Sequence, residues 1–325
     1  MGRVPAQPLS RIALAVALLL AALPAARAEE PQPRFTVDVR LVRVLATVKD
    51  ATGQLIGSLS KEDFQILDNG VPQQLAIFEH HTEQPLSITV MIDTSASTGI
   101  DLKYEVDSVN RFFAALFREG NPNDAASLLA FNWETTQLED FTHNLARLDN
   151  GLRRIRSEGG TSLYDSIYLA AGGLDGREGR HVIIVVTDGG DTTSYKTFHD
   201  ALRAAQMTDT VLYPVLVVPI TNNAGRNTGG ENALATLAQN TGGRVFAPSL
   251  GAELDAAFLE IIRDLRTQYL LAYYPKDVPL TKDPFHRIEI KLKRPDLRVS
   301  ARSGYYGETE PPKGAKGAKG WRPIK

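Results

Sequence analysis

The sequence predicts an α/β protein in which a doubly wound, open parallel sheet is inserted into a small all-β, sandwich-like module. Two observations carry this prediction. In the middle of the chain, from about residue 84 to residue 267, apolar runs of strand length alternate with helical patterns. Such alternation is typical of a parallel sheet that is buried on both faces. On both sides of this stretch, in residues 33–83 and 268–306, apolar positions recur with a period of two, which indicates β-strands.

The composition is that of a globular protein. The 325 residues are 43% hydrophobic and 23% charged, which is enough for about two domains and a sizeable core. The formal net charge is −2 and no long basic stretch interrupts the body of the chain, so we expect no nucleic-acid partner. The absence of cysteine from the sequence excludes disulfides, thiolate metal sites and a cysteine nucleophile.

Residues 1–28 have the pattern of a signal peptide. Arg3 and Arg11 precede the apolar run 12–23, and alanines stand at positions 26 and 28, where a signal peptidase requires small side chains. The apolar run is short for a membrane span, and no later stretch approaches the roughly 20 apolar residues that a membrane helix needs. We therefore expect an exported protein, periplasmic or secreted, that does not span the membrane.

The N-terminal β module is expected in residues 33–83. Apolar positions alternate from Phe35 to Leu41 and then change phase over Val42–Val48, which indicates a strand with a bulge or two short strands. Farther along, Asn69-Gly70 separates two apolar segments, and Asn-Gly favours a tight hairpin because both residues tolerate positive φ. The module is too short to bury much surface alone.

The central stretch, residues 84–267, contains the elements of the α/β domain. Strands are expected at 86–92, 125–131, 181–186, 211–218 and 244–246, with a hairpin after the second strand. Helices, recognised by apolar residues at intervals of three and four, are expected at 103–117, 163–174, 197–207 and 252–267.

The C-terminal segment 268–306 returns to strand patterns, at 269–274, 287–293 and 297–301. We expect these strands to pack with residues 33–83 into one sandwich from which the α/β domain extends. Residues 307–325 form a basic tail with no periodic apolar face, which we expect to be disordered.

Oxygen-bearing side chains follow the predicted strands of the α/β domain. Asp93, Ser95 and Ser97 form a D-x-S-x-S motif directly after the first buried strand, at the edge where open α/β sheets bind ligands. Thr161 lies in a glycine turn before a predicted helix, and Asp188 follows the strand 181–186. Such oxygens suit a hard divalent cation, although Ser and Asp also favour turns and helix caps for local reasons alone.

With these motifs in view, residues 86–267 resemble a von Willebrand factor type A (vWA) domain, whose hallmark is the metal-ion-dependent adhesion site. The resemblance implies that Asp93, Ser95, Ser97, Thr161 and Asp188 hold Mg²⁺, or Mn²⁺ or Ca²⁺ in its place. It also implies that the two serine hydroxyls bind the cation directly, and that a partner protein supplies a Glu or Asp to an open coordination position.

A wider resemblance covers most of the mature chain. The flanking β segments, with Phe64 after Lys61-Glu62-Asp63 and with the closing sequence 302–306 (Arg-Ser-Gly-Tyr-Tyr), are similar to the secreted VWFA-related proteins of acidobacteria. The partners of those proteins are generally unknown.

Several other polar and aromatic residues stay outside the predicted ligand set. Asp165 and Asp191 lie near Thr161 and Asp188 in the sequence, but they fit a solvated helix start and a loop acid. Trp133, in the hairpin after the second strand, fits either an exposed contact residue near the metal face or a residue buried against the sheet. The six histidines show no zinc-ligand spacing.

Three functions compete at this point. The leading hypothesis is a metal-dependent protein-binding module for adhesion or assembly. A metal-dependent hydrolase is the first alternative, but the sequence contains no G-x-S-x-G elbow, no P-loop, no second carboxylate cluster and no histidine placed by motif as a base. We therefore do not expect an enzyme. The second alternative is a structural envelope protein whose metal site has no function.

Overall fold

The computed structural model describes residues 41–80, 84–96, 102–118, 120–217 and 228–307. The predicted signal peptide, the strand predicted from Phe35 and residues 308–325 of the basic tail lie outside the described residues. So does Ser97 of the D-x-S-x-S motif.

The α/β domain is built on a five-stranded mixed sheet with the order β7-β6-β5-β8-β9. Its strands are β5 (Leu86–Asp93), β6 (Ala125–Phe131), β7 (Thr135–Thr142), β8 (Arg180–Thr187) and β9 (Val211–Leu216). Four strands are parallel, and β7 pairs antiparallel with β6 at one edge. Every residue of β5 and β8 is buried, as expected for central strands that are covered on both faces.

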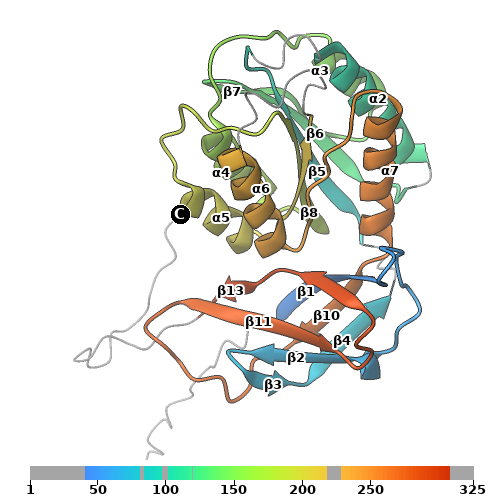
Figure 1. Cartoon of the computed structure of the whole chain (residues 1–325), viewed down its shortest axis with the longest axis vertical. Coiled ribbons are helices and arrows are strands. Elements are labelled where there is room, and N and C mark those ends of the chain that lie inside the picture. Colours follow the sequence, from blue (N-terminus) through green and yellow to red (C-terminus); the bar gives the residue numbers. More distant parts are fainter. Residues whose placement is uncertain (1–40, 81–83, 97–101, 119, 218–227, 308–325) are drawn as a thin grey trace, which may run out of the picture. The chain divides into compact units, whose positions relative to one another are not determined.

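Helices cover both faces of this sheet (Figure 1). They are α2 (Leu102–Arg118), α3 (Leu145–Leu152), α4 (Leu163–Leu174), α5 (Phe198–Met207), α6 (Thr228–Thr241) and α7 (Ala252–Arg266). One hydrophobic core joins α2, α3 and α7 to the sheet, and a second joins α4, α5 and α6 to its other face. The predicted α/β class with helices on both faces is confirmed.

The α/β prediction differs from the structure in one strand and in two helices, α3 and α6, that were not predicted. The strand expected at 244–246 is reduced to a single bridge between Phe246 and Val215. The ladder cannot extend in either direction, because Pro214 and Pro248 have no N–H group to donate at the next positions. Helix α6, which begins Thr-Gly-Gly, was not predicted, since its early glycines disfavour a helix and its buried apolar residues are few.

The remaining strands form two antiparallel four-stranded sheets with the orders β12-β1-β10-β4 and β13-β11-β2-β3. Their bounds are β1 (Val42–Lys49), β2 (Phe64–Asp68), β3 (Val71–Gln73), β4 (Leu75–His80), β10 (Tyr269–Tyr273), β11 (Phe285–Leu292), β12 (Arg298–Ala301) and β13 (Gly304–Tyr306). A short 3₁₀ helix, Lys61–Asp63, precedes β2. Each sheet combines strands from both flanks of the α/β stretch, since β1 pairs with β10 and β2 with β11.

The predicted Asn-Gly turn lies between β2 and β3, but residues 74–78, expected as the second strand of this hairpin, fall mainly in β4, which belongs to the other sheet. Asn69 and Gly70 have φ angles of 47° and 81°, the left-handed values that a tight hairpin turn requires. The division of the chain into domains at residues 83 and 268 stays a prediction.

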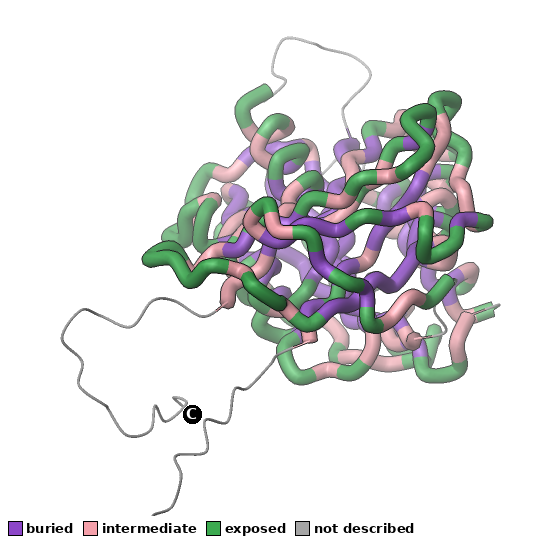
Figure 2. Tube along the Cα trace, turned by 90° about the horizontal axis from the view of Figure 1, so that it is seen from below, coloured by how far each residue is buried: buried purple, intermediate pink, exposed green. Residues whose placement is uncertain are grey.

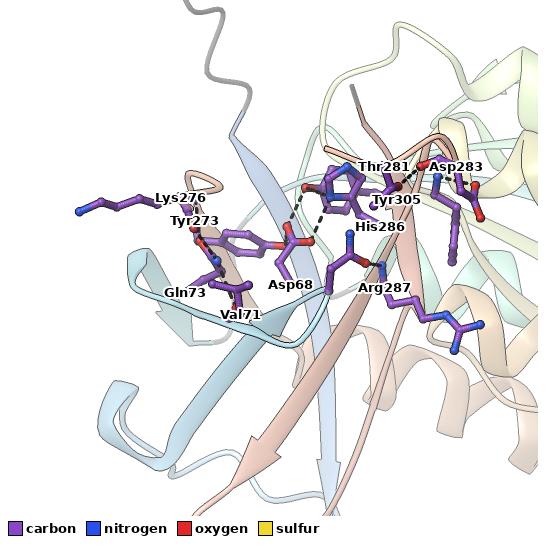
Figure 3. Close-up of polar contacts among 12 residues, drawn as sticks. Asp68, Val71, Gln73, Tyr273, Lys276, Thr281, Asp283, His286, Arg287 and Tyr305 are labelled. Atoms are coloured by element: carbon purple, nitrogen blue, oxygen red, sulfur yellow. Dashed lines mark hydrogen bonds and ion pairs between the residues drawn. The ribbon is translucent and has the colours of Figure 1, made fainter. Parts of the chain in front are cut away.

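A buried polar cluster links the two β sheets (Figure 3). The carboxylate of Asp68 accepts hydrogen bonds from the hydroxyls of Tyr273 at 2.9 Å and Tyr305 at 2.7 Å, and its Oδ1 lies 3.1 Å from Nδ1 of His286. Burial and the neighbouring Asp68 carboxylate raise the pKa of both tyrosine hydroxyls, so they stay protonated and act as donors. Tyr273 belongs to one sheet, and the other three residues belong to the second.

Buried residues run through the interior of the described segments, and exposed residues concentrate in the connections (Figure 2). In the part of the chain that the structure covers, no helix is both long and apolar enough to cross a membrane.

Candidate metal site

The site forms at the carboxyl ends of the neighbouring parallel strands β5 and β8. Asp93 is the last residue of β5 and is fully buried. Its Oδ1 accepts a hydrogen bond from the backbone N–H of Ser95 at 2.9 Å, and its Oδ2 accepts one from the hydroxyl of Thr187, the last residue of β8, at 2.6 Å. Two strands therefore hold this carboxylate in one orientation.

The electrostatic surroundings of Asp93 disfavour its negative charge. The pKa of the Asp93 carboxyl is raised from 3.8 to about 6, chiefly by burial and to a smaller extent by the nearby carboxylate of Asp188, while hydrogen bonds from Thr187 and Ser95 oppose the rise. The main causes of this shift include no basic side chain. A negative charge on Asp93 is thus disfavoured at this edge of the sheet, and a bound cation would stabilise it.

The loop after β5 carries the serines of the motif. Ser95 is buried and its side chain is hydrogen-bonded to Asp93. Its carbonyl oxygen accepts a hydrogen bond from the hydroxyl of Ser157 at 3.0 Å. The backbone N–H of Thr94 donates to the carbonyl of Phe131, the last residue of β6, at 2.7 Å. The motif loop is thereby tied to the neighbouring strand.

Thr161 lies in a loop that touches both of the other loops of the site. It is 5% exposed. Its backbone N–H donates to the hydroxyl of Thr192 at 2.9 Å, and its carbonyl accepts from the backbone N–H of Thr192 at 2.8 Å. On the other side, the backbone N–H of Ala96 donates to the carbonyl of Gly159 at 3.2 Å. The segments that contain Asp93, Thr161 and Asp188 are thus joined by hydrogen bonds.

Asp188 is half-buried and directly follows β8. The next residue, Gly189, has a φ of 111°, and its backbone N–H donates to the hydroxyl of Thr187 at 3.1 Å. Helix α6 packs closely here, because a Cβ atom on Gly230 would lie 1.5 Å from the carbonyl oxygen of Gly189. Glycine is therefore required at position 230.

The two acids left outside the ligand set bind backbone N–H groups. The carboxylate of Asp165 accepts from the N–H of Tyr195 at 3.0 Å and of Lys196 at 2.6 Å. Asp191 accepts from the N–H of Tyr164, at the start of α4, at 3.3 Å. These contacts order the loop after β8.

Trp133 lies between β6 and β7 and is 54% exposed. Its indole ring covers Gly159, where an added Cβ atom would lie 2.2 Å from Cδ1 of the ring. The residue therefore combines a contact with the Thr161 loop and a large exposed surface.

Thr187 is the residue that sequence reasoning missed. It holds Asp93 and the backbone of Gly189 at once. The signal that could have found it is a hydroxyl residue at the end of a buried strand, directly before Asp188.

The donor set fits a hard cation. Asp93 and Asp188 supply carboxylates, and Ser95 and Thr161 supply hydroxyls, all of them oxygen ligands of the type that Mg²⁺ prefers. Within the described residues, no group of three or more His, Cys, Asp and Glu side chains could hold a metal. A cation here would therefore depend on the neutral hydroxyls as well as on the two carboxylates.

Comparison with known proteins identifies the domain. Residues 88–190 match the family model of the von Willebrand factor type A domain. Among solved structures, the vWF domain of the type V pili tip protein Mfa5 from Porphyromonas gingivalis is similar at 16% identity, with a TM-score of 0.47, over 55% of this chain and 94% of that one. The von Willebrand factor type A protein from Catenulispora acidiphila is 12% identical, with a TM-score of 0.46, over 76% and 74%.

A third similar structure is the PilB minor pilin from Streptococcus sanguinis, which is 11% identical, with a TM-score of 0.45, over 57% of this chain and 62% of that one. No curated protein matches the chain. The narrower resemblance to the VWFA-related proteins of acidobacteria stays a prediction. The family model and the observed α/β fold together show that this chain contains a von Willebrand factor type A domain.

Proposed function

We propose that this protein is an exported binding protein whose vWA domain holds a divalent cation and uses it to engage an acidic residue of a protein partner. The observation that carries the proposal is the environment of Asp93. This carboxylate is fully buried beside Asp188, and the main influences on its pKa include no basic group. A buried acid of this kind is stabilised when a cation is bound.

The residues of the site would act in distinct ways. Asp93 is held in place by Thr187 and by the N–H of Ser95, so little side-chain freedom would be lost on binding a cation. Asp188, Thr161, Ser95 and Ser97 would complete the set of ligands. Because hydroxyls are neutral ligands, the bound cation would retain attraction for the carboxylate of a partner.

Residues around the site could supply the remaining contacts. Trp133 is 54% exposed and Tyr195, in the loop after β8, is 97% exposed. Exposed aromatic side chains make effective contact residues in protein interfaces. We therefore expect substitutions of Trp133 or Tyr195 to weaken partner binding while leaving the affinity for the cation unchanged.

A metal-dependent hydrolase is the weaker alternative. Hydrolysis needs a base that can take a proton from water. Two acids close to the ligand set in sequence, Asp165 and Asp191, already accept hydrogen bonds from backbone N–H groups. These two carboxylates stabilise the loop after β8, so their role is structural, and this favours a binding function over a hydrolytic one.

The decisive experiment is affinity capture from envelope extract with immobilised protein, in Mg²⁺ and in EDTA. We expect a partner that binds in Mg²⁺ and is lost both in EDTA and with the Asp93→Ala variant. Asp191→Asn is the matched control, since it removes an acid of the same face outside the ligand set. A partner that binds equally well in EDTA would refute metal-dependent recognition and would favour the structural envelope protein.

A further inference from the structure

A second polar site lies away from the metal site, where the first residue of β8 and the end of α5 meet strands β1 and β10. A pocket there is lined by side chains that include Arg43, Arg180, Gln206, Asp209 and Arg302. The cavity has a volume of about 40 Å³. At roughly 10–15 Å³ for each water molecule, this space suits a small ion and is too small for a nucleotide.

The charges of the pocket wall are unbalanced. Three arginines, Arg43, Arg180 and Arg302, face one acid, Asp209. Arg302 donates through Nη1 to Asp209 and through Nη2 to the carbonyl oxygen of Arg43. One carboxylate, that of Asp209, is therefore the only negative charge among the described lining residues to offset three positive charges.

Arg180 is the more deeply buried of the two buried arginines, Arg180 and Arg302. It is 3% exposed. Its Nη1 donates to the carbonyl of Leu265, at the end of α7, and its Nη2 donates to the carbonyl of Gln84 at 3.3 Å. These partners are neutral. Burial, and then the charge of Arg266, lower the pKa of Arg180 to about 10, whereas the nearby Asp124 is already ion-paired with Arg266 at 2.6 Å.

Both buried guanidinium groups keep one donor unused. Within the described part of the chain, Nε of Arg180 and Nε of Arg302 are buried and have no hydrogen-bond partner. A buried N–H of a charged group that lacks a partner is costly. Both residues also line the pocket, where the guanidinium groups favour an acceptor with negative charge.

Two backbone carbonyl oxygens flank the ring of His181 at the pocket wall. Its Nδ1 lies 2.6 Å from the carbonyl oxygen of Thr208, and its Nε2 lies 2.9 Å from that of Arg177. The pocket includes this ring as well.

We propose that this pocket binds a small tetrahedral oxyanion, such as inorganic phosphate or sulfate, through Arg43, Arg180 and Arg302. The three arginines come from different elements, β1, β8 and the connection between β12 and β13. Donors that converge from several directions suit a tetrahedral anion better than a flat carboxylate. Guanidinium groups are the side chains best matched to such oxyanions.

The proposal is tested by titrating phosphate into the mature protein without divalent cations, using calorimetry and thermal unfolding, with chloride of equal ionic strength as reference. We expect saturable binding of phosphate and sulfate, and weaker binding of acetate. Arg302→Lys keeps the charge but loses the planar guanidinium that binds an oxyanion through several N–H groups, and a charged hydrogen bond of 1.5–3 kcal/mol corresponds to a loss of about tenfold or more in affinity.

Two further variants keep the test independent of folding defects. Arg43→Gln removes an exposed charge of the pocket and should also weaken phosphate binding. Arg263→Gln, an exposed arginine of α7 outside the pocket, should not. Asp93→Ala should bind phosphate as the wild type does, which separates this site from the metal site. Absence of saturable phosphate binding, or equal binding by wild type, Arg302→Lys and Arg43→Gln, would overturn the proposal.

Discussion

Replacement of Asp93 by Asn should stabilise the metal-free protein and abolish its response to metal. The pKa of Asp93 is raised from 3.8 to about 6 in the folded protein. The difference of about 2.2 units, at about 1.36 kcal/mol for each unit, corresponds to about 3 kcal/mol. Because the folded state binds this proton more tightly than the unfolded state, the free energy of unfolding falls as the pH rises from about 4 to about 6. At neutral pH the full destabilisation is present.

The Asn side chain removes this charge but keeps most of the geometry. Its Oδ1 can still accept from the N–H of Ser95, whereas its amide nitrogen replaces the oxygen that accepts from Thr187. Loss of that hydrogen bond costs about 1 kcal/mol. We therefore expect Asp93→Asn to raise the free energy of unfolding by about 2 kcal/mol at pH 7.5 in EDTA, and to lower it slightly at pH 4.

In Mg²⁺ the wild type should become more stable than Asp93→Asn, the reverse of the order in EDTA at pH 7.5. A ligand that binds only the folded state at 100 times its Kd stabilises it by about 2.7 kcal/mol, and Asp93→Asn should gain almost nothing. Urea unfolding of both proteins, in EDTA and in Mg²⁺ and at both pH values, measures all of these differences. Asp191→Asn, which removes an acid outside the proposed ligand set, should respond to Mg²⁺ as the wild type does. An equal gain from Mg²⁺ in wild type and Asp93→Asn, or a less stable Asp93→Asn in EDTA at pH 7.5, would refute the reasoning.

Four other predictions concern the ligands, the partner, the β strands and the N-terminus. Thr161→Ala and Asp188→Ala should reduce the rise in Tm that Mg²⁺ or Mn²⁺ causes, which thermal unfolding measures. A captured partner should bind less well when its critical Glu or Asp becomes Gln or Asn, because the amide lacks the charge that the cation attracts; equal affinity in a calorimetric titration would contradict this. Residues 33–83, expressed alone, should be unfolded by circular dichroism, since β1 and β2 pair with strands from the C-terminal segment; a sharp unfolding transition would count against it. Mass spectrometry of exported protein should find Glu29 as the first residue, and an intact N-terminus would instead indicate an anchor.

The order of strands and helices in the α/β domain could be predicted because it depends on local patterns. Runs such as residues 181–186 are apolar throughout, and only a strand that is covered on both faces accommodates such a run. The Asn69-Gly70 hairpin follows in the same way from the conformational freedom of two residues. Where the local signal was weak, as in the glycine-rich start of α6, the prediction missed the element.

The candidate metal ligands stand in motifs next to strand ends, so the sequence could nominate them. The hydrogen bonds and the burial that set their properties come from residues far away in the chain. Thr187 donates to Asp93 across 94 positions, and the raised pKa of Asp93 results chiefly from its complete burial in the folded protein.

The arginine pocket was not predictable at all. Arg43, Arg180 and Arg302 share no motif and are separated by more than a hundred positions each. They meet because strand β1 pairs with β10 and β12 while β8 begins beside the end of α7. The sequence by itself thus determined which segments form strands and helices and which oxygens stand at strand ends, because these depend on neighbouring residues. Only the tertiary structure decided which distant charges share one buried space, because strand pairing and helix packing bring them there.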